Sequence, residues 1–72
     1  MKILTDKKVV LNLVGLDGNA FALMGAFRQA ARRQGIAKDQ IDAVIAECQT
    51  GDYNHLLQTL IAHTESAGDS ED

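Results

Sequence analysis

The chain has 72 residues, of which 46% are apolar, three are aromatic and one is a cysteine, so it forms at most one domain with an aliphatic core and no internal disulfide. No stretch approaches the roughly 18 apolar residues of a membrane span, and the first apolar run is too short for a signal peptide, so we expect a cytoplasmic protein without membrane contact. Net charge is −3, but residues 1–38 hold all seven Lys and Arg with two acids, whereas residues 39–72 hold eight acids and no Lys or Arg. The charges of the two halves either neutralise each other, within the fold or across a dimer, or their asymmetry marks an interaction surface.

The first expected element is a strand over residues 8–14, KVVLNLV, because β-branched residues favour extended backbone. Both of its faces are mostly apolar, and its edge needs a partner. Residues 2–5 could supply one through a turn at Asp6-Lys7, giving a hairpin over 2–14. The other solution is strand-to-strand pairing with a second copy of the chain, which predicts a homodimer. One face carries Val9, Leu11 and Leu13, and the other carries Val10, Asn12 and Val14.

A helix over about 20–34 follows the turn-rich GLDGN loop, where Asp17 or Asn19 can cap its first N–H groups. Gly35 suits its carboxyl end, and Ile36 suits the apolar position just after that cap. At 100° per residue the apolar residues gather on one face. That face carries Ala20, Leu23, Met24, Phe27, Ala30 and Ala31.

Two further helices are expected over about 38–49 and 53–64, the second capped by Asp52 after a break at Thr50-Gly51. The fold class is therefore α+β, mainly α, with one domain over 1–65. Residues 66–72, SAGDSED, are expected to be a disordered and dispensable acidic tail. The inward residues are Ile41, Val44, Ile45 and Cys48 on the first of these helices, and Tyr53, Leu56, Leu57, Leu60 and Ile61 on the second.

Two segments carry a resemblance. VLNLVGLDGNAFALMGAFRQAARRQG, residues 10–35, and TGDYNHLLQTLIAHTE, residues 50–65, together resemble a group of small uncharacterised proteins from bacteria and phages. The resemblance implies a prokaryotic or viral origin and no particular activity; Thr50 and Asn54 depart from its SGDYDHLL pattern. Residues 34–61, with a short helix, a Gly-Ile turn, a second helix, Gly-Asp and a third helix, are also similar to ubiquitin-associated-type three-helix modules. This is an analogy of fold and implies no function.

The sequence offers little for catalysis, metal binding or cofactors. His55 and His63 lie eight residues apart on one helix, about 12 Å along its axis, so they cannot readily share an ion. Cys48 lies within an apolar stripe and is expected to be a buried, unreactive thiol. His55 is expected to be exposed. The GLDGN loop lacks a phosphate-binding signature, and Asp17 would repel a phosphate. We therefore expect no enzyme, no metal and no cofactor.

The candidate binding residues are Phe21, Arg28, Arg32 and Arg33 on the first helix and Asp39, Asp42 and Glu47 on the second. Aromatic residues and arginines are enriched at interfaces, which favours a non-catalytic protein-binding function. If the bacterial and phage resemblance holds, the partner could be a host protein, and an acidic face of Asp39, Asp42, Glu47 and Asp52 could then imitate nucleic-acid phosphates and occupy its basic groove. A nucleic-acid binder using the basic face is the alternative, and a pI near 5 speaks against it. The plainer interpretation is that these charges form salt bridges to one another.

Overall fold

The computed structural model describes residues 2–66, so the predicted tail, except for Ser66, lies outside the described residues. The elements in chain order are β1 (Val9–Val10), α1 (Ala20–Arg33), α2 (Lys38–Cys48), α3 (Tyr53–His63) and β2 (Thr64–Glu65). The predicted fold class, α+β and mainly α, is confirmed. None of the three helices in this part of the chain combines the length and the apolar composition needed to cross a bilayer.

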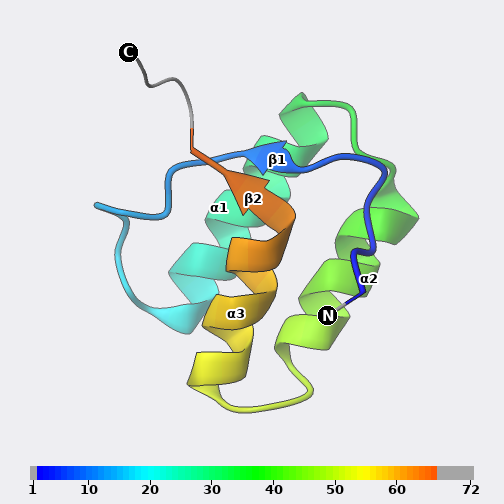
Figure 1. Ribbon diagram of the computed structural model, residues 1–72. Coiled ribbons are helices and arrows are strands. Elements are labelled where there is room, and N and C mark those ends of the chain that lie inside the picture. Colours follow the sequence, from blue (N-terminus) through cyan, green and yellow to red (C-terminus); the bar gives the residue numbers. More distant parts are fainter. Residues whose placement is uncertain (1, 67–72) are drawn as a thin grey trace.

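The two strands form a small parallel sheet across one end of the three helices (Figure 1). Val9 pairs with Thr64 and Val10 with Glu65. The strand is therefore much shorter than the predicted 8–14, and its partner is the segment just after α3. Residues 2–5 form no strand, so the chain does not adopt the hairpin that was one of the two expected solutions. The two faces of residues 9–14 differ in burial, since Val9 is buried and Leu11 and Leu13 are half-buried, whereas Val10 and Val14 are exposed.

The second edge of β1 is covered by a side chain. The amide of Gln34 accepts a hydrogen bond from the Val10 N–H and donates one to the Val10 carbonyl, both at 2.8 Å. A primary amide carries a donor and an acceptor in the same arrangement as a neighbouring strand does. Both edges of β1 are thus occupied within one chain, so β1 has no free edge for pairing with a second copy.

Helix α1 begins and ends as its sequence predicts. The Asn19 carboxamide oxygen accepts from the N–H groups of Phe21 and Ala22, at 2.8 and 3.3 Å. At the other end Gly35 adopts φ +84°, and the Ile36 N–H donates to the Ala31 carbonyl at 3.0 Å. This is a Schellman cap, in which a residue without Cβ occupies the left-handed conformation. The cap turns the chain toward α2 and buries Ile36.

The core is aliphatic, with Phe27 at its centre. The predicted inward stripes of the first two helices are confirmed, except that Ala20 is only half-buried. On α3 the prediction is wrong at Tyr53 and Ile61, which are exposed. The buried face of α3 consists of Leu56, Thr59, Leu60 and His63, spaced as one helical stripe.

Two polar residues, Thr59 and His63, lie in the core because their hydrogen-bonding groups have partners there. Thr59 Oγ1 donates to the His55 carbonyl at 2.8 Å. His63 Nδ1 lies 2.7 Å from the Thr59 carbonyl, and its Nε2 lies 2.9 Å from the Leu4 N–H. A carbonyl can only accept and a backbone N–H can only donate, so the ring is neutral, with its hydrogen on Nδ1. This ring anchors the amino-terminal segment that a hairpin was expected to hold.

Candidate functional site

The exposed flanks of α1 and α2 form the candidate site, which we name the α1–α2 face. It comprises Phe21, Arg28 and Arg32 of α1 with Lys38 and Asp42 of α2. Because a short connection joins the two helices, they run in opposite directions, and Arg32 lies near the start of α2 whereas Phe21 lies near its end. At 1.5 Å per residue, Phe21 and Arg32 are about 16 Å apart along α1. The face thus has a basic end and an aromatic end.

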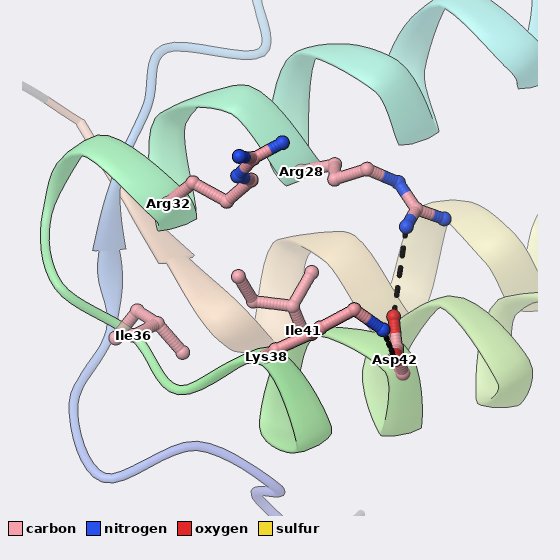
Figure 2. Close-up of a pocket in the computed structure, with 6 residues that line it drawn as sticks. All are labelled: Arg28, Arg32, Ile36, Lys38, Ile41 and Asp42. Atoms are coloured by element: carbon pink, nitrogen blue, oxygen red, sulfur yellow. Dashed lines mark hydrogen bonds and ion pairs between the residues drawn. The ribbon is translucent and has the colours of Figure 1, made fainter.

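The basic end is a cleft of about 360 Å³. Figure 2 shows Arg28 and Arg32 on the α1 wall, Lys38 and Asp42 on the α2 wall, and Ile36 and Ile41 between them. Both isoleucines are buried, so they give the cleft an apolar floor. Asp42 Oδ2 lies 2.9 Å from Lys38 Nζ, and its Oδ1 lies 3.5 Å from Arg28 Nη1. The Arg28–Asp42 contact joins α1 to α2, so the expected salt bridge between these helices is present.

The cations of the cleft stabilise a carboxylate. The pKa of Asp42 is lowered from 3.8, chiefly by the hydrogen bond from Lys38 and further by the charges of Lys38 and Arg28, although partial desolvation acts in the opposite direction. The Lys38 side chain is 88% exposed and that of Asp42 is 45% exposed. Exposed pairs of this kind add little stability. Their importance is that they establish the charge pattern of the cleft.

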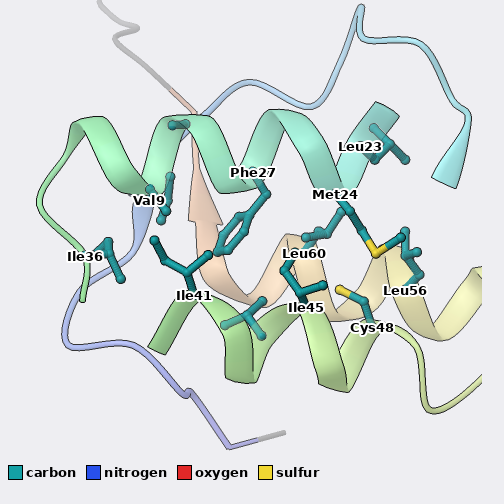
Figure 3. Packing of buried hydrophobic residues seen from close by; sticks show 13 residues of the cluster. Val9, Leu23, Met24, Phe27, Ile36, Ile41, Ile45, Cys48, Leu56 and Leu60 are labelled. Carbon is teal, nitrogen blue, oxygen red and sulfur yellow. The ribbon is translucent and has the colours of Figure 1, made fainter. Parts of the chain in front are cut away.

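The aromatic end is a hollow of about 310 Å³ between the first turn of α1 and the α2–α3 turn. Figure 3 shows Met24, Cys48 and Leu56, one from each helix, meeting at this end of the core. Phe21 stands at the rim with 80% of its surface exposed. Tyr53, on the opposite rim, donates its hydroxyl hydrogen to the Gly18 carbonyl. The hydroxyl is thus occupied by the loop before α1, and part of the ring remains in solvent.

Cys48 lies under the aromatic end, and its predicted burial is confirmed at 2% exposure. Burial raises the pKa of its thiol to about 11, and the neighbouring Glu47 charge acts in the same direction. A nucleophilic cysteine requires a lowered thiol pKa and access to its substrate. The surroundings of Cys48 provide neither.

A polar cluster of Glu47, Thr50 and His55 closes the α2–α3 turn. His55 Nε2 lies 2.9 Å from Glu47 Oε2, 3.1 Å from the Glu47 carbonyl and 3.2 Å from Thr50 Oγ1. A catalytic triad needs one ring nitrogen on the carboxylate and the other on the hydroxyl. Here a single nitrogen meets both, and Thr50 already donates to the Glu47 carbonyl at 2.8 Å. The cluster therefore stabilises the turn, and the expectation of an exposed His55 is wrong because the side chain is 31% exposed and paired.

The acidic candidate residues are mostly engaged within the chain. Asp42 pairs with Lys38 and Arg28, Glu47 with His55, and Asp52 caps α3 by accepting from the His55 N–H at 2.9 Å. Asp39 is exposed at the start of α2. Most of these carboxylates therefore already have a partner within the chain.

Arg33 is exposed and does not line the basic cleft; it lines a neighbouring shallow hollow together with Gln29 and Arg32. Sequence reasoning missed Lys38, Ile36 and Ile41 as parts of the cleft. Lys38 could have been found, because its spacing of four residues from Asp42 on one helix is a typical ion pair. The two isoleucines carried no such signal, since a floor is defined only once both helices are packed.

Within residues 2–66 no three His, Cys, Asp or Glu side chains gather closely enough to hold a metal ion. No protein-family model matches the chain, and neither a curated protein nor a solved structure is similar to it at a significant level. The bacterial and phage resemblance accordingly stays a prediction from the sequence.

Proposed function

We propose that this chain is a small non-catalytic interaction protein that binds a partner protein through the α1–α2 face. The observation that carries the proposal is the exposure of Phe21. This residue belongs to the first turn of α1, lies on the rim of a hollow, and is 80% exposed to solvent. Burying a phenylalanine side chain yields about 1.5–3 kcal/mol, which the isolated chain does not gain at this position. A partner that covers the ring would gain it.

The remainder of the face supports the same function. Arg28 and Arg32 continue the exposed flank that begins at Phe21, and Gly25, between Phe21 and Arg28, is a small residue over which a partner can approach closely. Aromatic anchors and arginines are the side chains in which binding energy is concentrated at protein interfaces. We further propose a bacterial or phage origin and a cytoplasmic location, where a reducing environment suits the free thiol. A host protein is then the expected partner.

Nucleic acid is the second candidate, favoured by the grouping of Arg28, Arg32 and Lys38 at one end of the face. Phosphate contacts made by these cations would supply salt-dependent affinity. Against this candidate, Asp42 lies among the cations, Asp39 follows directly on the same helix, and the whole chain is negative. The observations therefore favour a protein partner.

Site-specific photocrosslinking tests the proposal. The photoreactive residue p-benzoylphenylalanine is placed at Phe21 in the cells that make the protein, and at Gln58, an exposed residue of α3, as the matched control. We expect a discrete cross-linked protein species at position 21 that is weak or missing at position 58. Equal patterns at the two positions would contradict the proposed face, and a nuclease-sensitive species would favour the nucleic-acid candidate.

A further inference from the structure

The cleft at the basic end offers a ligand two kinds of contact at once. Its walls carry the cations Arg28, Arg32 and Lys38, and its floor consists of Ile36 and Ile41. A purely ionic surface patch would lack the floor, and a purely apolar groove would lack the cations. A segment that fills this cleft of about 360 Å³ must therefore bring an aliphatic group beside a negative one.

The charge of the cleft is incompletely balanced. Within the part of the chain that the structure describes, Asp42 is the one carboxylate in its lining, and it contacts Arg28 and Lys38. Among residues 2–66 no carboxylate lies within ion-pair distance of Arg32. A guanidinium presents two parallel N–H groups that match the two oxygens of a carboxylate. Arg32 is thus the cation with capacity for an external carboxylate, and Arg28 can be shared with Asp42.

We propose that the basic cleft binds an acidic–aliphatic segment of the partner protein, with a Glu or Asp carboxylate on Arg32 and an adjacent leucine-type side chain over Ile36 and Ile41. This inference rests on the proposed protein-binding function and names the chemistry recognised at one end of the face. Asp42 occupies part of the same cationic environment, so it competes with the incoming carboxylate and limits affinity.

A nucleic-acid strand fits this cleft less well. A phosphodiester backbone carries a negative charge at every step, and beyond the cleft it would meet Asp39 on the surface of α2. Its sugar and phosphate groups would also leave the apolar floor without a matching partner. An acidic peptide places its negative charge at one point and its aliphatic side chain beside it, which is the pattern that the cleft presents.

Fluorescence polarisation with a labelled octapeptide of alternating leucine and glutamate tests the inference on the full chain. We expect saturable binding with a Kd below about 1 mM, and no binding of the matching leucine–lysine octapeptide. Arg32→Ala should weaken binding by about tenfold, the loss typical of one charge-assisted hydrogen-bonded contact. Arg33→Ala is the matched control, because it removes the same charge from the neighbouring residue outside the cleft, and it should change the Kd by less than about twofold.

A second variant, Asp42→Asn, tests the inference through an expected increase in affinity. Removing the competing carboxylate should tighten peptide binding by a few-fold, a result that misfolding cannot produce. The inference is overturned by any of three results: no binding of the acidic peptide, equal losses for Arg32→Ala and Arg33→Ala, or tighter binding of a single-stranded octanucleotide. If the peptide does not bind but the cross-link at position 21 is observed, only this inference is wrong. If neither peptide binding nor the cross-link is observed, the proposed function is wrong as well.

Discussion

The side-chain amide of Gln34 substitutes for a third strand beside β1. It meets both polar groups of Val10 with two hydrogen bonds of 2.8 Å, from its position at the carboxyl end of α1, next to Gly35. Edge strands that expose such groups invite pairing with other chains. Gln34 therefore both completes the sheet and protects its edge.

Gln34→Ala tests this role. Each of the two lost hydrogen bonds contributes about 0.5–1.5 kcal/mol, so we expect a loss of about 1–2 kcal/mol in the free energy of unfolding, measured by urea denaturation. Gln29→Ala, at an exposed position on the same helix, is the control and should change little. Indistinguishable midpoints for the two variants would show that the Gln34 contacts add no net stability.

The raised thiol pKa of Cys48 predicts that the stability of the fold depends on pH. The pKa of its thiol is about 11 in the folded chain against an ordinary value of 9.0. Between these two values the unfolded chain releases the thiol proton and the folded chain retains it, so the free energy of unfolding falls as pH rises through this window. Stability curves of wild type and Cys48→Ala, measured from pH 8 to about pH 11, should converge with rising pH. A constant difference between the curves would contradict the shifted pKa.

At the scale of the elements, local signals predicted the helices well. Capping residues such as Asn19, Asp52 and Gly35 act within one turn, so their effect can be read directly from the sequence. Long-range contacts could not be read in this way. β2 has only two residues and no strand pattern, and it exists because α3 delivers Thr64 beside Val9. The rotation of α3 was missed because satisfied hydrogen bonds let Thr59 and His63 enter the core.

Alanine substitutions at Gly51, in the α2–α3 turn, and at Gly25, in α1, should change the free energy of unfolding in opposite directions. A Cβ at Gly51 would lie 2.9 Å from both Cβ and Cγ of His55, closer than such atoms approach, whereas a Cβ at Gly25 would meet nothing within 4 Å. We expect Gly51→Ala to lower the free energy of unfolding by about 1–3 kcal/mol through overpacking. Gly25→Ala, inside α1, should raise it by up to about 1 kcal/mol. Two shifts of the same sign in thermal unfolding would refute this account of the turn.

At the scale of the whole molecule, the candidate site was predictable as a list of residue types and not as an arrangement. The spacing of Phe21, Arg28 and Arg32 on one flank of a helix is visible in the sequence. The pairing of Arg28 with Asp42, the position of Arg33 outside the basic cleft and the apolar floor all depend on how α1 packs against α2.

Self-association stays a prediction, but its location changes. Val14 is 89% exposed and Ile61 55% exposed, and both line one shallow hollow next to the sheet. We expect a dimer by sedimentation at micromolar concentration, and conversion to monomer by Val14→Asp. Leu16→Asp, in the same loop but outside the hollow, should leave the dimer intact. A wild-type chain that sediments as a monomer at high concentration would end this proposal.

The central claim is that the aromatic and basic ends of the α1–α2 face bind one partner together. Its most direct test is the cross-linking yield from p-benzoylphenylalanine at position 21, compared between chains that also carry Arg32→Ala or Arg33→Ala. Because Arg32 is about 16 Å from the photoreactive group along the helix, it can affect the yield only through binding of the shared partner. We predict a severalfold lower yield with Arg32→Ala and an unchanged yield with Arg33→Ala. Equal yields in the two backgrounds would contradict the claim.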